Sequence, residues 1–109
     1  TNPAGIENNN HLTTAHDLAI LASEAMKNKT FAKIVNTAKI TISNLEGKNQ
    51  YVLENTNKLV AAVLGVKGVK TGWTTNAGEC LITNVKRGNK EVMIVVLHSQ
   101  DRFGETKKI

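Results

Sequence analysis

The most regular pattern of apolar and polar positions begins near residue 14 and has the spacing of an amphipathic α-helix. Thr14 has a side chain that can cap the first backbone N–H groups, and Asp17 follows three positions later, much as in a capping box. Apolar residues then recur at intervals of three and four, which places them on one helix face. These residues are Leu18, Leu21, Ala22, Ala25 and Met26. We therefore expect a helix that begins at Thr14, buries this face and follows an ordered loop over residues 1–13.

A second short helix and a β-hairpin are predicted next. Thr30 can cap the helix, and residues 38–43 then alternate between polar and apolar side chains, as a half-buried strand does. A turn over residues 44–48 leads to a returning strand over 50–53. The helix carries Phe31, Ile34 and Val35, and Ile40 and Ile42 are the side chains expected on the buried face of the strand. Residues 59–64 are apolar, but the run is too short to distinguish a turn of helix from irregular structure.

The last third of the chain predicts an antiparallel meander with strands over residues 68–72, 78–86 and 91–98. The Arg-Gly-Asn-Lys sequence between the last two strands is typical of a tight hairpin turn. Residues 92–97 are apolar at every position, so this strand must be covered on both faces and its sheet must be a middle layer. A final helix is expected over 101–109. The predicted fold class is α+β, an antiparallel sheet with helices packed on its faces.

Length and composition indicate one domain of modest size. The 109 residues, 40% of them hydrophobic, suffice for one small core, so a single unit over residues 1–109 is expected. The net charge of +5 suits nucleic acid, anionic lipid or a carboxylate-bearing polymer, but an aromatic content of 4% argues against nucleic acid as a partner. Cys80 is the only cysteine, which excludes an intrachain disulfide and favours a small apolar role. We expect no membrane segment in this chain, because it has no run of 18 apolar residues.

The chemistry of the chain concentrates in Lys70-Thr71-Gly72, at the end of the first meander strand. If this strand lies beside a groove, Lys70 presents an ammonium to an anionic group and Thr71 presents a hydroxyl that can bind a carboxylate. Gly72 lacks a Cβ and lets a ligand pair with the backbone as an added strand. Taken alone, the tripeptide is better explained as an ordinary amphipathic strand that ends in a lysine and a turn. It is also one of three signature elements of penicillin-binding proteins and class A β-lactamases.

Three other segments make a family resemblance specific. Asn-Pro-Ala-Gly-Ile at residues 2–6, Thr-Ala-His-Asp-Leu-Ala at 14–19 and Ala-Gly-Glu-Cys-Leu at 77–81 stand in order around Gly-Val-Lys-Thr-Gly at 68–72. Over nearly its whole length the chain thus resembles the serine D-alanyl-D-alanine carboxypeptidases, low-molecular-mass penicillin-binding proteins that trim peptidoglycan stem peptides. The resemblance implies a β-lactamase/transpeptidase-like fold, the D-Ala-D-Ala terminus as substrate and acylation by β-lactams. It also implies a location in the cell envelope, outside the cytoplasm.

The same resemblance implies a role for each residue around the strand end. Lys70 would be catalytic, and Lys70 and Thr71 would hold the terminal carboxylate of the substrate or of a β-lactam. Gly72 would leave room for the peptide backbone. The backbone N–H of Trp73 or Thr74 would contribute to an oxyanion hole, because that amide must lie where negative charge develops. Packing is the alternative role for the Trp73 side chain.

Further candidates lie outside the tripeptide. Arg102 matches a position where the family often has an arginine near the cleft, so we count it among the substrate-binding candidates; a solvated helix face is the alternative. His11 and His16 span a loop and a helix start, which is a poor metal pair, and His98 has no partner in the sequence. No metal and no cofactor is expected.

Acyl transfer in the resembled family also requires a Ser-x-x-Lys turn and a Ser-x-Asn element, and the chain has neither. The residues three positions after Ser23, Ser43 and Ser99 are Met26, Glu46 and Arg102. Thr30 and Lys33 have the required spacing, but Thr30 is better explained as a helix cap. We therefore expect the C-terminal portion of a catalytic domain, inactive alone, whose serine nucleophile lies upstream.

A last expectation concerns assembly. In the resembled fold another strand lies beside the last one, and its absence would leave residues 91–98 as an open edge that invites self-association. Two other functions remain open at this point. The chain can be a portion of a β-lactamase-type hydrolase, or a non-catalytic basic binding module.

Overall fold

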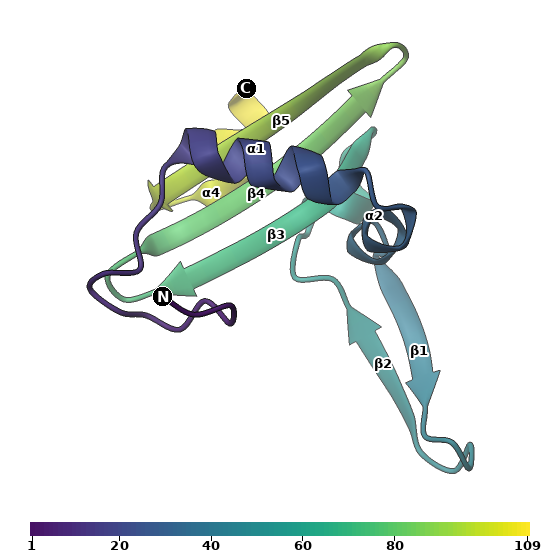
Figure 1. Cartoon of the computed structure of the whole chain (residues 1–109). Helices are drawn as coiled ribbons and strands as arrows, with labels where there is room; N and C mark the ends of the chain where they lie inside the picture. The colour runs from purple at the N-terminus through teal and green to yellow at the C-terminus, as the bar shows by residue number, and fades with distance from the viewer.

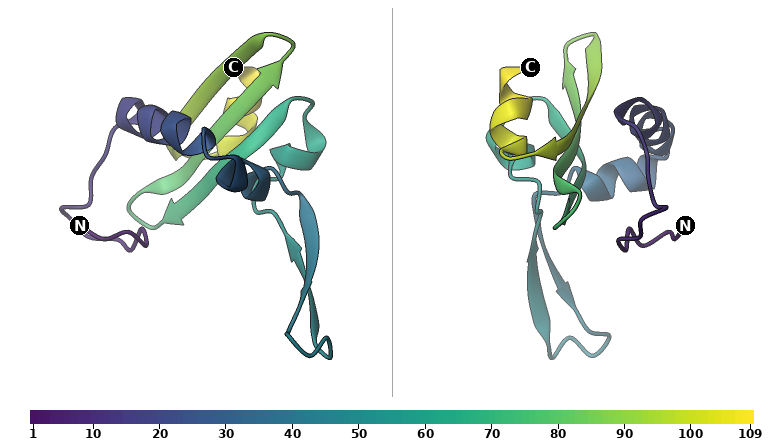
Figure 2. Two further views of the ribbon diagram at one scale, coloured as in Figure 1. Left: turned by 45° about the vertical axis from the view of Figure 1, so that its right-hand side comes forward. Right: turned by 90° about the vertical axis from the view of Figure 1, so that its left-hand side faces the viewer.

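The protein is a three-layer arrangement of one antiparallel sheet between two pairs of helices, with a hairpin projecting from it (Figure 1). The computed structural model describes all residues from 1 to 109. In chain order the elements are α1 (Ala15–Met26), α2 (Lys29–Val35), β1 (Lys39–Ser43), β2 (Gln50–Glu54), α3 (Leu59–Ala62), β3 (Val66–Thr74), β4 (Gly78–Arg87), β5 (Lys90–Ser99) and α4 (Arg102–Lys108). Helices α1 and α2 cover one face of the β3–β4–β5 sheet, and α3 and α4 cover the other (Figure 2). This confirms the α+β class and the middle-layer sheet.

Helix α1 begins as predicted, but one residue of its expected apolar face points outward. The Thr14 hydroxyl accepts a hydrogen bond from the Asp17 backbone N–H at 3.1 Å. Ala22 is 5% exposed, whereas Leu21 is 64% exposed, so the expected burial of Leu21 is wrong. Leu21 lies about 100° around the helix from Ala22, at the margin of the stripe that contacts the sheet. None of the helices, of which α1 is the longest at 12 residues, has the length and apolar character needed to cross a bilayer.

Helix α2 begins two residues earlier than predicted, at Lys29. The Asn28 side-chain oxygen accepts hydrogen bonds from the backbone N–H groups of Thr30 and Phe31, both at 3.0 Å, and Asn28 is therefore the N-cap. The prediction that Thr30 caps this helix is wrong. Asparagine and threonine are both good N-caps, and the choice between two candidates so close in sequence depends on where the incoming chain turns.

The β1–β2 hairpin forms at the predicted place but is not half-buried. Ile40 pairs with Leu53 and Ile42 with Tyr51, and every residue of both strands is exposed. The hairpin projects away from the sheet, and no element of the chain covers its apolar side (Figure 1). The expected burial of Ile40 and Ile42 is therefore wrong.

The core lies between β3, β4 and the helices α3 and α4. Leu59, Val66 and Leu81 form its buried centre, and Phe103 of α4 packs against them. Residues 59–64, undecided from the sequence, begin with the helix α3, whose first backbone N–H at Leu59 donates to the Asn57 side-chain oxygen at 3.1 Å. The core therefore fixes α3 and α4 against one face of the sheet.

Strand β5 is the edge of the sheet. The strand order is β3–β4–β5, so β5 hydrogen-bonds to β4 on one side only. Helices α1 and α4 lie against its two faces, as the uniformly apolar residues 92–97 predict. The open edge expected from the sequence is therefore present in this chain.

Candidate functional site

The predicted site lies on β3, the other edge strand of the sheet, and its side chains leave the strand on alternate faces. Thr71 stands opposite Leu81, a core residue on the α3–α4 side, and Lys70 stands opposite Ile82. Directly opposed residues share a face, so Thr71 faces the α3–α4 layer and Lys70 the α1–α2 layer. A ligand that contacts both side chains must lie along the free edge of β3, where the two faces meet.

Within the tripeptide, Lys70 is exposed to solvent and the neighbouring Thr71 is buried. The Lys70 ammonium folds back and donates a hydrogen bond to the Thr71 carbonyl oxygen. Thr71 is only 9% exposed, and its hydroxyl lies 2.8 Å from the hydroxyl of Thr56, in the connector before α3. The cation is therefore available to a ligand, whereas the hydroxyl is held in place by a protein partner.

Arg102 joins the first turn of α4 to the end of the tripeptide. Its guanidinium donates to the Gly72 carbonyl oxygen at 2.8 Å, and its backbone N–H donates to a Glu79 carboxylate oxygen at 3.1 Å. The guanidinium carbon lies 5.0 Å from the centre of the Phe103 ring, a cation–π distance. Arg102 is half-buried and attached to β3, so the alternative of a solvated helix face is wrong.

The start of α4 explains how Arg102 reaches β3. Asp101 is the N-cap, and its carboxylate accepts a hydrogen bond from the Gly104 backbone N–H at 2.9 Å. The Arg102 Nε is buried without a hydrogen-bond partner. The arginine is thus held at the strand end with donor capacity that the protein does not use.

Trp73 and Thr74 follow the tripeptide at the turn into β4. The Trp73 side chain is 66% exposed, so the alternative in which the indole packs in the interior is wrong. Thr74 accepts a hydrogen bond from the Ala77 backbone N–H at 3.0 Å through its hydroxyl, which closes the turn. Both residues extend the strand end that Lys70, Thr71 and Gly72 begin.

Two residues of this region were missed by sequence reasoning. Thr56 and Glu79 contact Thr71 and Arg102, respectively, although they lie 15 and 23 residues away in the chain. A signal for the first is present in the sequence: Asn-Thr-Asn at residues 55–57 is a run of side chains that bind backbone groups. Glu79 gave no such signal.

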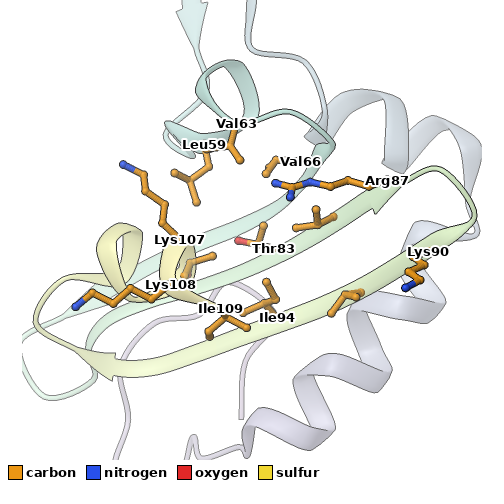
Figure 3. A pocket seen from close by; sticks show the side chains of 13 residues that line it. Leu59, Val63, Val66, Thr83, Arg87, Lys90, Ile94, Lys107, Lys108 and Ile109 are labelled. Atoms are coloured by element: carbon orange, nitrogen blue, oxygen red, sulfur yellow. The ribbon is translucent and has the colours of Figure 1, made fainter.

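A cavity lies elsewhere, between α3, α4 and the sheet (Figure 3). It has a volume of about 420 Å³, apolar walls that include Leu59, Val63 and Ile94, and basic side chains around its mouth. Those basic residues are Arg87, Lys90, Lys107 and Lys108. None of the predicted site residues lines this cavity, so it is separate from the edge of β3.

Comparison with known proteins identifies the class that this fold and strand end define. Residues 1–101 match the family model described as D-alanyl-D-alanine carboxypeptidase, and the chain belongs to this family. It is similar to the D-alanyl-D-alanine carboxypeptidase DacF of Bacillus subtilis, with 37% identity over 95 residues. A D-alanyl-D-alanine carboxypeptidase of a Streptomyces species is 36% identical over 99 residues. These alignments cover 87% of the chain in both cases but only 24% and 34% of the relatives.

Solved structures agree with the family assignment and with the β-lactamase/transpeptidase-like fold. A Streptomyces DD-transpeptidase matches 95% of the chain with a TM-score of 0.87 and 36% identity, and the match covers 42% of that structure. A Listeria monocytogenes penicillin-binding protein in its ampicillin-bound form matches 95% of the chain with a TM-score of 0.79 and 30% identity, covering 43% of that structure. The chain thus spans less than half the length of each relative.

Proposed function

We propose that the chain is the C-terminal portion of the catalytic domain of a serine D-alanyl-D-alanine carboxypeptidase. The full-length protein removes the terminal D-Ala from peptidoglycan stem peptides in the cell envelope, outside the cytoplasm, and is acylated by β-lactams. One observation carries the proposal: the Thr71 hydroxyl and the Arg102 guanidinium approach the same strand end from the α3–α4 side, and Arg102 binds the Gly72 carbonyl at 2.8 Å. A hydroxyl and a guanidinium are the donors that a carboxylate needs.

Each residue of the strand end has a role in this reaction. The substrate lies along the free edge of β3, next to Gly72, and its terminal carboxylate is bound by Thr71 and Arg102. Lys70, on the other face, donates to the Thr71 carbonyl in this structure; in the reaction its ammonium turns to the ligand at the free edge of β3 and stabilises negative charge there. The backbone N–H of Trp73 or Thr74 donates to the oxyanion of the tetrahedral intermediate.

The nucleophile belongs to the part of the protein outside this chain. A serine hydroxyl attacks the carbonyl carbon of the penultimate D-Ala, the bond to the terminal D-Ala breaks, and that residue leaves with a proton on its amine. Water then hydrolyses the acyl-enzyme. A β-lactam opens its ring on the same serine, and the similarity to a penicillin-binding protein in its ampicillin-bound form supports this.

Labelling with a fluorescent penicillin tests the proposal. The full-length protein is expected to form a covalent adduct that survives denaturation, because it contains the serine and the strand end together. The 109-residue chain alone is expected to form none. A full-length protein without an adduct, or an isolated chain with one, contradicts the proposal. Rapid turnover of the adduct instead indicates a β-lactamase-type hydrolase.

We also propose that the isolated chain self-associates through β5. An antiparallel pair with Val95 opposite its own copy places Met93 opposite Leu97 and Ile94 opposite Val96, so apolar side chains meet on both faces. Val92→Lys is expected to shift the chain to monomer in sedimentation experiments, because Val92 is 52% exposed and charges at an edge oppose pairing. Thr75→Lys, in the exposed β3–β4 turn, is the control. A wild-type monomer at every concentration, with fast amide exchange over 92–97, excludes this assembly.

A further inference from the structure

The contact between the hydroxyls of Thr56 and Thr71 is the feature that the proposed reaction leaves unexplained. The two oxygens are 2.8 Å apart, a normal distance for a hydrogen bond between hydroxyls. Thr71 is nearly buried, whereas Thr56 is exposed and belongs to the connector between β2 and α3. The pair therefore joins an exposed connector residue to the one hydroxyl of the tripeptide.

The direction of this hydrogen bond decides what Thr71 can do. Each hydroxyl has one proton and can accept from other donors. If Thr71 donates to Thr56, its proton is used, and only lone pairs face a ligand. If Thr56 donates to Thr71, the Thr71 proton is free to bind an anion, and the chain of two hydrogen bonds polarises it further. A carboxylate beside Thr71 therefore requires Thr56 to be the donor.

The connector is built to keep Thr56 in place. The Asn55 side-chain amide donates to the carbonyl oxygens of Val35 and Thr37, both at 3.0 Å. The Asn55 side-chain oxygen accepts from the Asn57 backbone N–H at 2.9 Å. Asn57 is 3% exposed. Thr56 thus lies between two anchored asparagines, and its hydroxyl is positioned before any ligand arrives.

We propose that Thr56 is a positioning residue for carboxylate binding: it donates its hydroxyl proton to Thr71, which directs the Thr71 proton toward the ligand carboxylate. This inference rests on the proposed function, because it requires a carboxylate at Thr71. Thr56 itself does not touch the ligand. This role accounts for the hydrogen bonds that attach the polar connector to the end of α2 and to β3.

The test uses the full-length protein and measures the second-order rate of acylation by benzylpenicillin. Thr56→Val removes the hydroxyl at nearly constant volume and is expected to lower this rate by up to about tenfold, the upper end of what one hydrogen bond between neutral groups contributes. Thr56→Ser keeps the hydroxyl and is expected to stay near the wild-type rate. The thermal midpoints of both variants are expected to match the wild type, because Thr56 is exposed.

A double-mutant cycle separates positioning from a general structural role. In a Thr71→Val background, Thr56→Val is expected to have no further effect, because the residue through which it acts is gone. Additive losses, or an equal loss in Thr56→Ser, overturn the inference. An unchanged acylation rate in Thr56→Val also overturns the inference, but the proposed function still stands if the wild type is acylated. A wild type that is never acylated overturns the inference and the proposed function together.

Discussion

Lys70→Met in the full-length protein is expected to lower the rate of penicillin acylation by about a hundredfold or more, the loss typical of removing one preorganised donor from an acyl-transfer site. Methionine keeps the length and apolar stem of lysine but removes the ammonium. Lys70 is exposed on β3, and its only recorded hydrogen bond is to the carbonyl of the next residue, Thr71. The protein is therefore expected to fold normally.

Lys67→Met is the matched control for this experiment. Lys67 is an exposed lysine near the start of the same strand, before the tripeptide. Its replacement makes the same change in net charge, so a general effect of charge on penicillin binding appears in both variants. Acylation that is unaffected by Lys70→Met, or is reduced equally by Lys67→Met, excludes a specific role for Lys70. Rates are measured by stopping the labelling reaction at fixed times.

Gly68→Ala is expected to lower the free energy of unfolding by about 3 kcal/mol, because backbone strain and overpacking each cost about 1 to 3 kcal/mol. Gly68 has a φ of +137°, a conformation that residues with a Cβ rarely adopt. An added Cβ would lie 2.7 Å from a methyl carbon of Val35 and 3.2 Å from its carbonyl oxygen. Helix α2 must therefore move away from β3 or the strand must change path. Urea unfolding followed by circular dichroism measures the loss.

Gly72→Ala is the control, because a Cβ added at this position of the same strand clashes with no other atom. The nearest atom to an added Cβ at Gly72 is the Cys80 Cβ at 3.7 Å, an ordinary contact. Stability is expected to stay near wild type in this variant, whereas ligand approach to the strand edge is obstructed. Equal destabilisation by the two substitutions would contradict the contacts described for Gly68.

The elements with strong local signals were predictable from the sequence. The Thr14 cap, the Arg-Gly-Asn-Lys turn and the apolar run after it depend on neighbours in the chain, and the structure confirms α1 and the meander. The tripeptide is recognisable from the sequence because its three functional residues are consecutive. Order along the chain was enough for these features.

Features that depend on distant neighbours could not be predicted. The outward position of Leu21 depends on which line of α1 meets the sheet, and the exposure of Ile40 depends on the direction in which the hairpin projects. The Thr56–Thr71 contact joins residues 15 positions apart, and the Arg102–Gly72 hydrogen bond joins residues 30 positions apart. No periodicity reports such contacts.

The hydrogen bond from Arg102 to Gly72 couples the position of the β3 edge to that of helix α4. The carbonyl of Gly72 is fixed by a guanidinium whose position follows the N-cap at Asp101. A small rotation of α4 would therefore move the Gly72 carbonyl and, with it, the edge of β3 along which the proposed substrate lies. Under the proposed function, substitutions in α4 or at its cap would alter the preference for one stem peptide over another without replacing a residue that contacts the substrate.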